Sequence, residues 1–167
     1  MNFILTFILG IFVAISSLIT QVFVSLIAEL FFHIKNLTFQ YDMNDTIKNI
    51  IILIVLAAMI EECLRYIVIK YQISKYTRET TLLCIIYGIL FGFGFATLEA
   101  LMLFLGNSLS LNNIILFIPV IFIHTIASVF LMLTITKNSK IQFDIIFILL
   151  AILFHASANL ILYNSLI

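Results

Sequence analysis

Long apolar runs separated by short polar stretches make up most of the chain. The runs cover residues 3–32, 49–70, 81–105, 113–136 and 145–166. A helix that crosses a bilayer needs about 20 apolar residues at a rise of about 1.5 Å each, and every run reaches that length. The polar stretches are too short to form an extramembrane domain. The pattern therefore predicts an all-α fold, a polytopic bundle of about five transmembrane helices that forms a single integral membrane domain over residues 1–167.

The composition excludes a water-soluble globular protein. Hydrophobic residues make up 64% of the chain and charged residues 10%, whereas soluble domains are about 45–50% apolar and about a quarter charged. Eight basic residues balance eight acidic ones, so we expect the lipid bilayer and not a nucleic acid as the partner. Cys63 and Cys84 lie within apolar runs without the spacing of a metal site, and we expect both to be buried.

The loop charges predict the orientation in the membrane. With five spans, the N-terminal side carries five basic residues: Lys70, Lys75, Arg78, Lys137 and Lys140. The opposite side carries only Lys35 and Lys48. By the positive-inside rule the N-terminus lies in the cytoplasm and the C-terminus outside.

Several ionisable residues interrupt the apolar runs. They are Glu29, Glu61, Glu62, Arg65, Glu99, His124 and His155. A charged side chain at the centre of a membrane helix costs about 2.5–3.5 kcal/mol even on insertion scales, so such residues indicate a functional site. All except Glu29, which we expect at the interface, and Glu99, which lies nearer the outer leaflet, fall near mid-membrane depth. Four helices can therefore meet at one polar chamber.

Arg65 follows Glu61 by four residues and Glu62 by three, and either spacing brings a carboxylate within reach on a helix. Adjacent residues differ by about 100° around the axis. We expect Arg65 to hold one glutamate while the other faces a cavity, a pattern suited to general acid and base chemistry. The alternative is a purely structural ion pair.

Small residues recur every four positions in the third run, at Gly88, Gly92, Ala96 and Ala100. Such a stripe lets a neighbouring helix approach closely, and it directs Glu99 towards protein. In the fifth run, His155 and Asn159 are four residues apart, which places the imidazole and the amide on one helix face.

Four short motifs, in order, resemble those of the PrsW-type intramembrane proteases, within the broader group of CAAX prenyl endopeptidases and bacteriocin-processing membrane proteins. Glu61-Glu62-Cys-Leu-Arg65 is similar to EExxK/R, and Phe95-Ala-Thr-Leu-Glu99 resembles FAxxE. His124 and His155 lie on separate later helices, the second within HxxxN. The acidic FAxxE favours the PrsW branch. The resemblance implies an intramembrane endopeptidase of a bacterial or archaeal cell membrane, acting on a membrane protein or a lipidated peptide.

The residues allow two versions of this hydrolysis. In one, Glu61 or Glu62 activates water while a histidine and the Asn159 amide stabilise the oxyanion. In the other, which we favour, Glu99, His124 and His155 bind Zn²⁺, with a paired glutamate as a further candidate ligand. Arg65 is expected to form the structural ion pair in both versions.

Two functions without catalysis compete with the protease. The same glutamates and histidines could relay protons or cations across the bilayer. They could also hold a membrane partner in a binding or immunity protein. Glutamine at Glu61 and Glu62 would be tolerated only in the last case.

Overall fold

The computed structural model describes residues 2–32, 47–74, 80–106, 111–135 and 141–166, with side chains for 2–27, 51–74, 80–102, 118–135 and 144–162. Its helices are α1 (Phe3–Phe32), α2 (Ile47–Val68), the π-helix η1 (Ile69–Ile73), α3 (Thr81–Gly106), α4 (Leu111–Leu133) and α5 (Ile141–Leu166). The described residues contain no strand. The predicted all-α helix bundle is confirmed.

Three helices are long and apolar enough to cross a membrane within the described residues, at Phe3–Ile27, Thr81–Met102 and Asp144–Leu162. The described part of α4 adds a shorter apolar stretch, Ile118–Leu133. Helix α2 is less apolar because its described part carries Glu61, Glu62 and Arg65.

The helix ends follow local hydrogen bonding. The Asn2 side chain accepts a hydrogen bond from the Ile4 amide at 3.1 Å and so caps α1, because the first amides of a helix have no partner inside it. At the end of α2 the chain enters η1, where the Ser74 amide bonds to the Ile69 carbonyl at 3.0 Å. This wider turn carries Ile69 and Ile73 into the core, where both are fully buried.

Polar residues on the exposed face of α1 are satisfied within the helix. Ser16 donates to the Phe12 carbonyl at 2.9 Å, and Thr20 donates to the Ser16 carbonyl at 2.8 Å. In lipid there is no water to serve these hydroxyls, so back-bonding to the preceding turn is required. Large apolar side chains such as Phe12 and Ile19 cover the same face.

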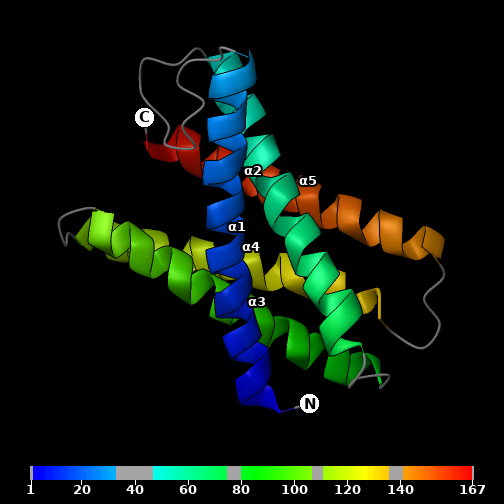
Figure 1. Cartoon of the computed structure of the whole chain (residues 1–167). Coiled ribbons are helices and arrows are strands. Elements are labelled where there is room, and N and C mark those ends of the chain that lie inside the picture. Colours follow the sequence, from blue (N-terminus) through cyan, green and yellow to red (C-terminus); the bar gives the residue numbers. More distant parts are fainter. Residues whose placement is uncertain (1, 33–46, 75–79, 107–110, 136–140, 167) are drawn as a thin grey trace.

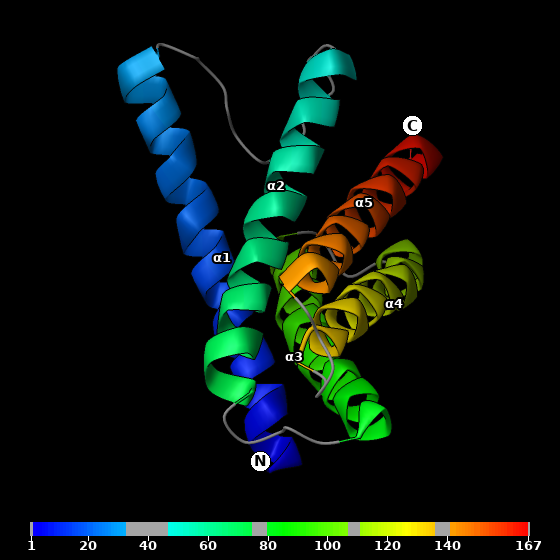
Figure 2. The same cartoon turned by 90° about the vertical axis from the view of Figure 1, so that its right-hand side faces the viewer.

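Two groups of helices cross one another in the bundle (Figures 1 and 2). Helices α1 and α2 run side by side in opposite directions, and α3, α4 and α5 pass across them. Helix α3 packs against both α4 and α1, and α5 packs against α4 and α2. The main apolar core lies among α1, η1, α3, α4 and α5, and a smaller one forms around Ile54, Ala58 and Ala156.

Glycines set the closest contacts of α3. A Cβ on Gly88 would lie 2.8 Å from the Val129 Cα, and one on Gly92 would lie 2.5 Å from the His124 carbonyl oxygen. The two glycines of the stripe thus pack closely against α4; the sequence predicted a closely packed neighbour but not which helix it is. A second contact, which we did not predict, joins Gly94 to α1, where an added Cβ would lie 2.1 Å from the Phe7 carbonyl oxygen.

The two cysteines differ from one another. Cys84 is buried, as predicted, but the prediction for Cys63 is wrong, because its side chain is exposed. Position 63 lies on the outer face of α2, where lipid and not protein surrounds an apolar side chain.

Candidate active site

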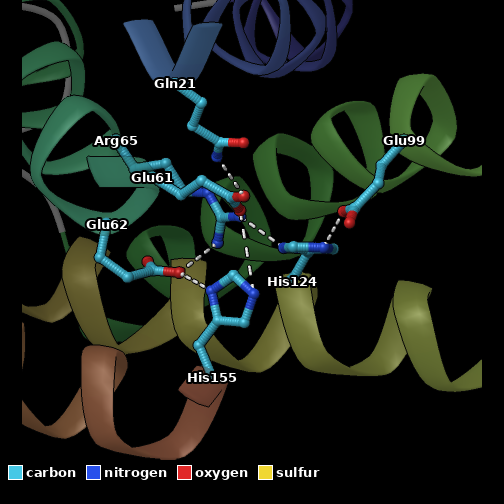
Figure 3. A network of polar contacts seen from close by, with 7 residues as sticks. All are labelled: Gln21, Glu61, Glu62, Arg65, Glu99, His124 and His155. Carbon is cyan, nitrogen blue, oxygen red and sulfur yellow. Dashed lines mark hydrogen bonds and ion pairs between the residues drawn. The ribbon is translucent and has the colours of Figure 1, made fainter. Parts of the chain in front are cut away.

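Polar side chains from all five α-helices meet at one point inside the bundle (Figure 3). Helix α2 supplies three of them, and the other four helices supply one each. The residues are Gln21 from α1, Glu61, Glu62 and Arg65 from α2, Glu99 from α3, His124 from α4 and His155 from α5. Six of these seven were singled out from the sequence, and the structure brings those six together.

Arg65 lies at the centre of this polar cluster and is fully buried. Its Nη1 donates to Glu62 Oε1 at 2.8 Å, and its Nη2 donates to Glu61 Oε2 at 3.2 Å and to His124 Nδ1. The expectation that Arg65 holds only one glutamate is therefore wrong. Both spacings place a carboxylate on the same helix face, and the forked guanidinium reaches both at once. The guanidinium carbon Cζ lies 3.7 Å from the centroid of the Phe95 ring, in a cation–π contact.

Glu62 fixes the orientation of His155. The Nδ1 atom of His155 lies 2.6 Å from Glu62 Oε1, and neither side chain is more than 1% exposed. An ionised carboxylate only accepts hydrogen bonds, so Nδ1 carries the proton and Nε2 keeps a free lone pair. Within the described part of the chain, this buried Nε2 has no hydrogen-bond partner. It lies 3.8 Å from Glu61 Oε2.

Gln21 holds Glu61 from the other side. Its Nε2 donates to Glu61 Oε1 at 2.9 Å, and the residue is 8% exposed. We did not predict Gln21, because we searched the apolar runs for ionisable residues only. An amide side chain within a 30-residue apolar run is the signal in the sequence that would have found it.

His124 lies between Arg65 and Glu99. Its Nδ1 contacts Arg65, its Nε2 contacts Glu99 Oε2, and its ring packs at 4.8 Å from both Phe95 and His155. The Glu99 side chain is 37% exposed, so it forms the edge of the cluster.

Asn159 lies on α5 one turn after His155 and is half-buried. Among the described contacts, no hydrogen bond joins its amide to the cluster.

Three side chains offer donor atoms close enough for a shared metal ion. One ligand atom each from Glu61, His124 and His155 lies within 4.8 Å of the other two. The cluster also contains three carboxylates and one arginine, so with neutral histidines and all of these groups ionised its charge is −2. A divalent cation would balance that charge, which is otherwise costly to bury.

Comparison with known protein families decides the identity. The family model for PrsW family intramembrane metalloproteases matches residues 2–167, almost the entire chain. The chain belongs to this family. It is therefore a membrane-embedded hydrolase of peptide bonds, of a family that uses a metal. Comparisons with curated proteins and with solved structures gave no match.

Proposed function

We propose that the cluster hydrolyses a peptide bond of a membrane protein or lipidated peptide, with Zn²⁺ held by Glu61, His124 and His155. The observation that supports this most directly is the buried, unpartnered Nε2 of His155, directed at Glu61 Oε2. Histidine nitrogen and carboxylate oxygen are the donors that zinc prefers in catalytic sites, at about 2.0–2.2 Å. The ligand atoms lie within 4.8 Å of one another and would have to move closer to share one ion, because two donors of a tetrahedral zinc site are about 3.4 Å apart.

The surrounding residues suit this arrangement. Glu62 accepts the Nδ1–H of His155 and so presents the opposite nitrogen to the ion, as carboxylates next to metal-binding histidines commonly do. Arg65 neutralises part of the acidic charge. Its Nη2 contacts both Glu61 and His124. Zinc binding through His124 Nδ1 would therefore replace the contact of that nitrogen with Arg65.

The interpretation from the sequence makes Glu99 a metal ligand and Glu61 a candidate general base. The geometry favours the reverse assignment. Glu61 lies within the group of three donors, whereas Glu99 lies at the partly exposed edge and lines a cavity beside Glu61. We assign Glu99 the role of general base, which takes a proton from the attacking water. A bound zinc ion would polarise the substrate carbonyl and make water a stronger nucleophile.

The alternative without a metal assigns the general base to Glu61 and not to Glu62. Gln21 and Arg65 orient Glu61, which lines the cavity, while Glu62 is fully buried and engaged by Arg65 and His155. Asn159 remains a candidate oxyanion donor in this version, which requires α5 to shift on substrate binding so that the amide reaches the cluster.

Metal content and cleavage, measured on the same protein in lipid nanodiscs, test the assignment. The substrate is a synthetic transmembrane peptide whose products are identified by mass spectrometry. We expect His155→Ala to lose both metal and cleavage, and Glu62→Gln to bind the metal about 10- to 100-fold more weakly. Glu99→Gln should lose cleavage even at saturating zinc, because its contact with His124 affects the metal affinity by about 10- to 100-fold and does not abolish binding.

Exposed neighbours on the same helices supply the controls. Ser157→Ala on α5 and Cys63→Ala on α2 should retain both metal and activity, because both side chains point away from the cluster. A metal-free wild-type protein that cleaves at full rate would exclude the zinc site and leave Glu61 as the base.

We also propose that the N-terminus is cytoplasmic and the C-terminus outside, in a bacterial or archaeal cell membrane. The excess of loop lysines and arginines on the N-terminal side supports this orientation. Protease accessibility of a tag at each terminus, in cells with intact and with permeabilised membranes, would give the reverse pattern if the orientation were inverted.

A further inference from the structure

A cavity of about 100 Å³ lies between α1 and α3 and ends at the polar cluster. Helix α1 contributes four of its lining residues, α3 contributes four and α2 contributes one. They include Ala14, Ser17, Leu18 and Gln21 on α1, Met102 on α3 and Glu61 on α2. This groove is separate from the place where the histidines meet, because neither histidine lines it.

The groove connects the lipid-facing surface with Glu61. Leu18 and Met102 at its outer end are 41% and 44% exposed, whereas Ser17 and Gln21 are 3% and 8% exposed. Small side chains at Ala14 and Ser17 leave the space, since a larger residue at either position would project into it. A group could therefore enter sideways from the bilayer and reach Glu61 without crossing water.

The inner end of the groove is polar. Gln21 uses one N–H to hold Glu61 at 2.9 Å, and an amide side chain has a second N–H and a carbonyl oxygen besides. A peptide backbone carries the matching acceptor and donor at every residue. A lipid acyl chain carries neither, so it would leave the polar end of the groove unsatisfied.

We propose that this groove binds one aliphatic side chain of an extended, membrane-embedded substrate segment, next to the bond that is cleaved. The proposal rests on the protease function described above. A cavity of roughly 150 Å³ holds benzene, so a space of about 100 Å³ fits a side chain of the size of valine or leucine more closely than an aromatic ring. Gln21 then positions both Glu61 and the backbone of the bound residue.

Filling the groove tests the proposal, with a neighbouring serine as the matched control. Ser17→Leu places a large side chain in the groove, whereas Ser16→Leu makes the same change on the exposed face of α1. The probes are synthetic transmembrane peptides with alanine, leucine or phenylalanine beside the mapped cleavage site. We expect Ser17→Leu to raise the KM for the leucine peptide at least tenfold with unchanged metal content, and Ser16→Leu to behave as wild type.

A second variant tests the proposal independently of whether Ser17→Leu folds. Met102→Ala widens the exposed rim of the groove and should raise cleavage of the phenylalanine peptide relative to the leucine peptide. Equal peptide preference in wild type and Met102→Ala, or equal KM values for the two serine variants, would overturn the proposal.

Photocrosslinking measures binding of the peptide in the groove independently of cleavage. A transmembrane peptide with photo-leucine at the same position should crosslink to residues of α1 or α3 that line the groove, even in the His155→Ala variant. Crosslinking without cleavage by wild type would support the groove and count against the protease assignment. Labelling of the groove by a photoreactive fatty acid, with no competition from the peptide, would show that an acyl chain occupies it and overturn the proposal.

Discussion

Replacing Gly92 by alanine tests whether the close contact between α3 and α4 sets the geometry of the active site. The new Cβ would lie 2.5 Å from the His124 carbonyl oxygen and 2.6 Å from the Thr125 Cα. Ordinary contact begins at 3.4 Å, so α4 must retreat by the difference, about 0.9 Å. Because the contact is at His124 itself, its imidazole moves relative to Glu61 and His155.

A displacement of about 1 Å in a catalytic group can reduce the rate about 100-fold, which corresponds to about 2.7 kcal/mol of activation free energy. The overpacked helix contact should also lower the free energy of unfolding by about 1–3 kcal/mol. We expect both effects in Gly92→Ala. Cleavage of a transmembrane peptide, normalised to folded protein, and denaturant unfolding in the same detergent measure them separately.

Gly94→Ala distinguishes misplacement of the site from general loss of stability. Its Cβ would lie 2.1 Å from the Phe7 carbonyl oxygen, a more severe clash than that of Gly92→Ala, but directed at α1. Phe7 precedes Gln21 by 14 residues, or about 21 Å of helix. We expect a similar or greater loss of stability with less than a tenfold change in cleavage. Equal loss of cleavage per folded molecule in both variants would refute the reasoning.

Three further predictions follow from the buried charges and the proposed metal. Arg65→Met leaves Glu61 and Glu62 buried without their cation, so the free energy of unfolding should fall by about 3–5 kcal/mol; a loss below 1 kcal/mol in denaturant unfolding would contradict the central role of this ion pair. Lys70→Met removes the ammonium 2.7 Å from Asp144, which is 4% exposed, and should lower stability by about 1–3 kcal/mol while cleavage per folded molecule stays unchanged. Adding zinc at 100 times its Kd should stabilise the metal-free protein by about 2.7 kcal/mol, seen as a rise in unfolding temperature; an equal rise in a variant without ligands would show that the ion binds elsewhere.

The amino-acid sequence determined the helices and the composition of the polar cluster. An apolar run in lipid must satisfy its backbone within itself, so each run forms a helix that ends near its polar boundary. The membrane also makes buried charge costly, and for that reason Glu61, Glu62, Arg65, Glu99 and the two histidines could be singled out as ionisable residues within apolar runs. A water-soluble chain of the same length would give no comparable signal.

Only the tertiary structure decided which atoms face one another. Depth along a helix does not specify rotation about its axis, and that rotation brings Glu61 rather than Glu62 to the cavity. It also groups Glu61 with the two histidines and leaves Glu99 at the edge. Gln21 joins the site because α1 packs against both α2 and α3. These rotations and crossings depend on packing between small residues far apart in the sequence, which an apolar pattern read one helix at a time does not contain.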